Sequence, residues 1–136
     1  MSANGSRGSL ASQNGSGPLI EARGITKSFG PTPALRGASF SADAGEIVAV
    51  MGPSGSGKST LLHCLAGILV PDSGEVWFGG RRLDTRSERD RSTLRRDQFG
   101  FVFQTGQLVP ELTAEENVAL PLLLNGSRRA AAMQEA

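Results

Sequence analysis

The sequence predicts an α/β fold, and three adjoining segments carry the prediction. Residues 47–51 form an uninterrupted apolar run, a glycine-rich segment follows at 52–57, and leucines recur at helical spacing in 58–66. An apolar run without alternation is typical of a strand covered on both faces, as in a parallel sheet. We therefore expect a buried parallel strand at 47–51, followed by a loop and a helix.

Strand-like segments are also predicted ahead of this unit. Residues 1–17 are mostly Ser, Gly and Asn. Such a composition buries too little apolar surface to offset the entropy of ordering, so we expect a disordered leader there and an ordered domain over 18–136. Residues 19–29 and 34–42 are short strand-like runs, and the Gly-Pro-Thr-Pro breaker at 30–33 separates them, which predicts a hairpin.

Two strands and two helices are predicted after the first helix. Residues 75–78 form a short strand-like run before a Gly-Gly turn, and 99–103 form another. Residues 87–96 predict a polar helix. The arginines of 81–97 alternate with acidic residues and lack aromatic neighbours, which favours a solvated helix face over a nucleic-acid patch. Thr113-Ala-Glu-Glu has the capping-box spacing that predicts a helix start.

Charge, cysteine content and hydropathy exclude several classes of protein. The chain has 14 basic and 13 acidic residues and a formal charge of +1, which argues against a dedicated nucleic-acid binder. Its single cysteine, Cys64, allows no intrachain disulfide, so we expect a reducing compartment. The longest apolar run, 118–124, contains Pro121 and is far shorter than the ~20 residues that span a bilayer. Membrane association is therefore expected only through a partner.

Residues 52–59 read Gly-Pro-Ser-Gly-Ser-Gly-Lys-Ser and match the G-x-x-x-x-G-K-[ST] pattern, called a P-loop or Walker A motif, between an apolar run and a helix. Glycines let the backbone fold around a phosphate without a Cβ clash, and the N–H groups of the loop and helix N-terminus present positive charge to it. Lys58 supplies a full charge at the β- and γ-phosphates. The Ser59 hydroxyl is a hard oxygen ligand for Mg²⁺.

The predicted nucleotide-binding residues of this loop are Gly52, Pro53, Ser54, Gly55, Ser56, Gly57, Lys58, Ser59 and Thr60. The alternative interpretation is a glycine-rich turn that only caps a helix. If the loop does bind phosphate, the motif alone leaves kinases, GTPases, helicases and transport ATPases open.

Three segments that flank the loop distinguish among these families. They are Lys-Ser-Phe-Gly at 27–30, the run 67–76, and Phe-Val-Phe-Gln at 101–104. In these places the chain resembles ATP-binding cassette (ABC) ATPases, and the resemblance covers residues 19 to about 126. The first segment resembles their antiparallel β-subdomain, with Phe29 at the adenine-stacking position, which is usually Tyr. The second resembles the turn and strand after the phosphate-binding helix, and the third resembles the Q-loop, with Gln104 as its glutamine.

The resemblance implies an α/β P-loop NTPase with an antiparallel β-subdomain, truncated within its helical subdomain. The sequence lacks three features of the family: the LSGGQ-type signature motif, a second apolar strand that ends in Asp-Glu, and a later switch histidine. Residues 18–136 are therefore expected to be the N-terminal part of a nucleotide-binding domain. The complete domain is expected to be an ATPase, whereas this part alone is expected to bind ATP and hardly to hydrolyse it. Lys58 and Gln104 are implied as catalytic residues, and Ser59 and Gln104 as Mg²⁺ ligands.

The implied partners are a second nucleotide-binding domain and an integral-membrane permease. The permease would place the chain in the cytoplasm, on the inner face of the membrane. Residues 99–121 are most similar to the lipoprotein-release and macrolide-export type. Two alternatives stay open. One is an ABC-type ATPase of DNA repair or chromosome maintenance, although the heptads of its coiled coil are not seen. The other is a non-catalytic nucleotide-binding module.

Overall fold

A computed structural model describes residues 17–136. The predicted disordered leader, residues 1–17, lies outside the described residues except for Gly17. The chain divides into two compact units, one up to Arg91 and one from Ser92 to Ala136. Each unit is described by itself.

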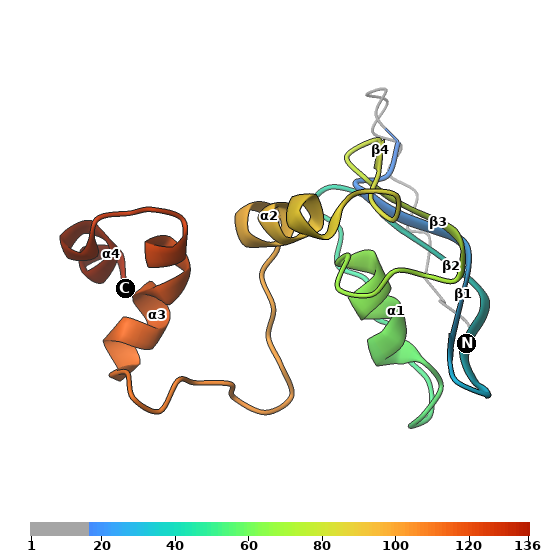
Figure 1. The fold of residues 1–136 in the computed structure, drawn as a ribbon, viewed down its shortest axis with the longest axis horizontal. Coiled ribbons are helices and arrows are strands. Elements are labelled where there is room, and N and C mark those ends of the chain that lie inside the picture. The colour runs from blue at the N-terminus through green and yellow to red at the C-terminus, as the bar shows by residue number, and fades with distance from the viewer. Residues whose placement is uncertain (1–16) are drawn as a thin grey trace. The chain divides into compact units, whose positions relative to one another are not determined.

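The first unit is built on a four-stranded antiparallel sheet in the order β2-β1-β3-β4 (Figure 1). Its strands are β1 (Ile20–Phe29), β2 (Thr32–Ala42), β3 (Ser73–Phe78) and β4 (Arg81–Arg82). β1 and β2 form the predicted hairpin, joined at Gly30 and Pro31 because glycine accepts the positive φ of the turn. The predicted strand at 75–78 and its Gly-Gly turn are also confirmed.

Helix α1 (Lys58–Leu65) packs against β1, β2 and β3 and closes the core of the first unit (Figure 1). The helix buries one face only, because its apolar side chains recur three and four positions apart. The buried apolar residues of this core are Ala22, Ile25, Leu35, Leu61, Cys64, Leu65, Ala66, Val76 and Leu83.

The helices after the sheet match the predictions in type and in approximate bounds. α2 (Glu88–Gln98) is the polar helix, and α3 (Ala114–Leu124) begins at the predicted capping box. There the Thr113 hydroxyl accepts from the Glu116 amide at 3.2 Å, and the Glu116 carboxylate accepts from the Thr113 amide at 2.9 Å. α4 (Arg129–Glu135) follows, and the only buried side chains of α3 and α4 are alanines. Among residues 17–136, none of these helices has the length and hydropathy of a membrane span.

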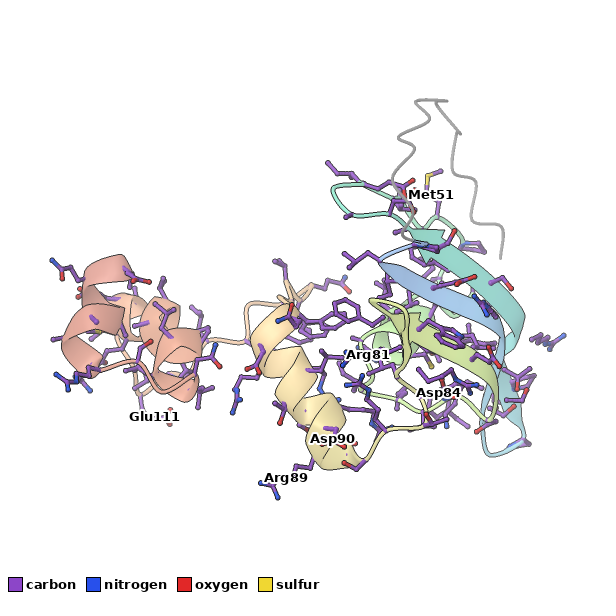
Figure 2. The ribbon with its side chains drawn as sticks, turned by 90° about the horizontal axis from the view of Figure 1, so that it is seen from above. Met51, Arg81, Asp84, Arg89, Asp90 and Glu111 are labelled. Atoms are coloured by element: carbon purple, nitrogen blue, oxygen red, sulfur yellow. The ribbon has the colours of Figure 1, made fainter. Side chains whose placement is uncertain are left out.

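The predicted buried strand at 47–51 is wrong. These residues form no strand, and the Ile47 side chain is 99% exposed (Figure 2 labels Met51, the last residue of the segment). A strand forms only where its N–H and C=O groups find a neighbouring backbone. The sheet of the described residues ends at β2 and β4, and 47–51 pairs with neither. The predicted parallel sheet is not present among the described residues either, because every strand pair there is antiparallel.

The predicted strand at 99–103 is also wrong. It is an exposed loop in the second unit, although its aromatic side chains are in contact: the Phe99 and Phe101 ring centroids are 6.4 Å apart, and those of Phe101 and Phe103 are 5.8 Å apart. The side chains of every second residue therefore lie on the same side of this loop, as they would in a strand. The local pattern is present, but no described strand pairs with it.

Candidate nucleotide-binding site

The glycine-rich loop turns tightly before α1. The Ser56 amide donates to the Pro53 carbonyl at 3.2 Å, while Gly55 and Gly57 adopt φ of +78° and +90°. Only glycine takes these left-handed values without a steric cost. The end of the loop is pressed against β2, because a Cβ at Gly57 would lie 2.4 Å from the Ala34 carbonyl oxygen. Tertiary contact with the sheet therefore helps to set the conformation of the loop.

Lys58 folds back over this loop. Its Nζ donates to the carbonyl oxygens of Gly52 at 2.6 Å and Pro53 at 2.7 Å, and it lies 3.4 Å from the Ser56 hydroxyl. An ammonium group carries three donors. Two are held by short bonds and the third has only the long contact, so the charge is fixed in the loop with one donor weakly engaged.

The N-terminus of α1 adds to this positive charge. Its N-cap is Gly57, no side chain caps it, and its first turn has no acidic residue. The first N–H groups of the helix and its dipole are therefore not compensated by a side chain. Ser59 and Thr60 lie in this first turn, Ser59 exposed and Thr60 half-buried. The structure thus brings together the predicted loop residues, Lys58 and Ser59 in an arrangement that suits an anion.

Phe29 is the last residue of β1, and half of its surface is exposed. The Lys27 ammonium lies over one face of the ring, 6.0 Å from its centroid. Lys27 is paired at 3.1 Å with Asp72, whose other oxygen accepts from the Ser28 amide at 2.7 Å. The bond from the Ser28 amide, and to a smaller extent the bond from Lys27, lower the pKa of Asp72. No functional role was predicted for Asp72 from the sequence. The only feature of the sequence that marks this residue is its place in the Pro-Asp-Ser-Gly turn.

Gln104 is an exposed residue of the loop that follows Phe103. It belongs to the second unit, so its approach to a metal ion beside Ser59 stays a prediction. Within the part of the chain that the structure describes, no three His, Cys, Asp or Glu residues gather as a metal site. A hydroxyl and an amide oxygen suit Mg²⁺, which keeps several waters and binds through few protein ligands plus phosphates.

The arginine-rich segment at 81–97 forms several ion pairs. Arg82 binds Glu75 at 2.9 Å and Asp84 at 2.6 Å, and Arg91 binds Glu88 (Figure 2 labels Asp84). Desolvation by burial raises the pKa of Asp84, but the bonds from Arg82 and from the Val76 amide outweigh it, so the pKa is lowered. Much of the basic charge here is thus neutralised by neighbouring carboxylates, as expected for a solvated face rather than a polyanion site.

Comparison with known proteins identifies the family. The ABC transporter model matches residues 35–136. Lipoprotein-releasing system ATP-binding protein LolD 2 of Rhodopirellula baltica is 49% identical over 113 residues, which are 80% of this chain and 44% of that protein. LolD of Xanthomonas axonopodis pv. citri is 43% identical over 122 residues, 87% of this chain and 50% of that protein. Macrolide export ATP-binding/permease protein MacB of Marinobacter nauticus is 46% identical over 113 residues, 80% of this chain and 18% of that protein.

Solved structures agree with this result. The dimeric structure of MJ0796, described as a bacterial ABC transporter cassette, matches with a TM-score of 0.79 and 34% identity over 85% of this chain and 53% of that chain. The chain spans about half the length of the LolD relatives that it matches. The predicted resemblance and the predicted fold class, a P-loop NTPase with an antiparallel β-subdomain, are confirmed. The chain belongs to the ABC transporter family, and its fold is that of the first part of an ATP-binding cassette.

Proposed function

We propose that the loop at 52–60 binds the phosphates of ATP with Mg²⁺, and that the complete protein hydrolyses this ATP to power a permease of the lipoprotein-release or macrolide-export type. The observation that carries the proposal is the Lys58 ammonium, held by two loop carbonyls beside an uncapped helix N-terminus. A fixed cation and unsatisfied N–H groups form a preorganised anion site. A phosphate oxygen would replace the weak contact to Ser56.

The remaining binding roles follow from the chemistry of the side chains. Ser59, exposed in the first turn of α1, would give its hydroxyl to Mg²⁺. Phe29 would stack on the adenine with the ring face that Lys27 does not cover. Gln104 would approach the metal and the attacking water in the activated state. Phosphoryl transfer depends mainly on positioning and charge stabilisation, and these residues would supply part of both.

The proposed partners follow from the relatives. LolD is named for lipoprotein release and MacB for macrolide export, and MacB is named as an ATP-binding and permease protein. The solved MJ0796 cassette is dimeric. We accordingly propose that this chain works in a dimer of nucleotide-binding domains, on the cytoplasmic face of a membrane, bound to a permease.

Calorimetric titration of the intact protein with ATP and Mg²⁺ tests the binding proposal. Lys58→Ala removes the charge-assisted contacts to the phosphates, so ATP affinity should fall about 10- to 150-fold. Arg36→Ala removes an exposed cation from β2 and serves as the matched control, with affinity unchanged. Equal affinity of the Lys58→Ala variant and the wild type would exclude this loop as the phosphate site.

A further inference from the structure

The end of β1 that carries Phe29 has a strand on one side only. The last pair between β1 and β3 is Thr26 with Ser73, so the following residues have only β2 beside them. On that side β2 pairs with β1 as far as Phe29, which lies opposite Thr32. On the other side no described strand offers acceptors to the backbone N–H groups beyond Thr26, so any hydrogen bond there has to come from another segment.

The turn before β3 supplies the missing bonds. Asp72 Oδ2 accepts from the Ser28 amide at 2.7 Å, and Asp72 Oδ1 accepts from Lys27 Nζ at 3.1 Å. The Asp72 amide itself donates to the Thr26 carbonyl at 2.8 Å. One residue thus bonds to three successive residues of β1, the last of them adjacent to Phe29.

These bonds also orient the ring. The Lys27 side chain is only 18% exposed, and its ammonium sits between the Asp72 carboxylate and one face of Phe29. Exposed ion pairs contribute little by themselves. A carboxylate bonded to a backbone amide is stronger, because charge-assisted bonds are shorter and about twice as strong as neutral ones. Asp72 therefore fixes both the backbone before Phe29 and the cation on its ring.

We propose that Asp72 is a positioning residue for the base-binding platform at Phe29, acting through the Ser28 amide and the Lys27 ammonium. The proposal rests on the proposed function, in which Phe29 stacks on adenine. Asp72 touches no nucleotide. It holds one ring face against Lys27, so that the other face is presented to the base in a fixed place. The recognition of the base, unlike that of the phosphates, then depends on a contact between β1 and the turn before β3.

The test compares two ligands that differ in the base. ATP and inorganic tripolyphosphate, each with Mg²⁺, are titrated by calorimetry into the intact protein. Asp72→Ala should lower ATP affinity about three- to tenfold, part of what loss of the stacking ring causes, and leave tripolyphosphate affinity unchanged. Asp72→Asn keeps an acceptor for the Ser28 amide and loses the charge beside Lys27, so its loss should be smaller. Asp43→Ala, at an exposed aspartate elsewhere in the first unit, should change neither affinity.

A second arm removes the ring itself. In a Phe29→Ala background, Asp72→Ala should have no further effect on ATP affinity. A loss that persists without the ring, an equal loss of both ligands, or unchanged ATP affinity would each overturn the positioning role. If the Asp72→Ala variant does not fold, the ratio of ATP affinity to tripolyphosphate affinity in the Asp72→Asn variant decides: a ratio below that of the wild type supports the positioning role, and an equal ratio overturns it. A wild type that binds neither ligand would overturn the proposed function as well, whereas normal wild-type binding with an unaffected Asp72 variant would overturn this inference alone.

Discussion

Replacing Gly57 by alanine tests how the sheet shapes the nucleotide loop. Gly57 has φ of +90°, and an added Cβ would lie 2.4 Å from the Ala34 carbonyl oxygen and 3.1 Å from Leu35 Cδ2. The left-handed conformation costs about 1–2 kcal/mol for alanine. The clash with a strand carbonyl, which cannot swing away as a side chain would, adds about 1–3 kcal/mol. Gly57→Ala should therefore reduce the free energy of unfolding by about 2–5 kcal/mol, a large share of the ~5–15 kcal/mol of an ordinary domain.

Gly55 is the matched control, because it has φ of +78° in the same loop and nothing within 4 Å of an added Cβ. Gly55→Ala should cost only the conformational term, about 1–2 kcal/mol. Urea unfolding of the intact protein measures both, and Gly57→Ala should also weaken ATP binding because Lys58 follows the displaced residue. Equal destabilisation by the two substitutions would refute the argument that β2 presses on the loop.

Three further predictions concern other parts of the chain. Gln104→Ala should lower ATP turnover of the complete protein while ATP affinity stays within a few-fold, because its proposed contribution lies in the activated state; normal turnover and normal permease stimulation would remove it from the mechanism. The Thr113 amide and then Arg129 lower the pKa of Glu116, so the capping contribution is present above the ordinary carboxyl pKa and is lost as the pH falls through the lowered pKa of Glu116; amide exchange at Thr113 should accelerate there, and Glu116→Gln should abolish this acid dependence. Residues 1–136 expressed alone should self-associate in light scattering, and Ile47→Asp should reduce this, since the Ile47 side chain is exposed on an unpaired segment; a monomeric, cooperatively melting wild-type chain would contradict it.

The elements that were predicted correctly depend on short-range interactions. The turn at Gly30 and Pro31 follows from the backbone preferences of two residues, and the capping box from side chains that reach backbone groups three residues away. The place of the glycine-rich loop at 52–57, directly before a helix, was predicted in the same way, because the motif fixes the spacing between the glycines and the lysine.

The two predicted strands that failed show the limit of such reasoning. Residues 47–51 and 99–103 have the apolar patterns of strands, but a strand also needs a neighbouring backbone. None of the described strands provides one, and the chain spans about half the length of the LolD relatives that it matches. The sheet formed by the described residues is therefore the antiparallel one alone.

The sequence by itself determined the hairpin, the helix starts and the glycine-rich loop before α1, because each depends on residues within a few positions of one another. Only the tertiary structure decided which apolar runs became strands and what holds the end of β1. Asp72 and Ser28 are 44 positions apart and share no sequence pattern. Their contact exists because Thr26 pairs with Ser73 in the sheet, and a pairing of that range is set by the packing of the whole unit rather than by the local sequence.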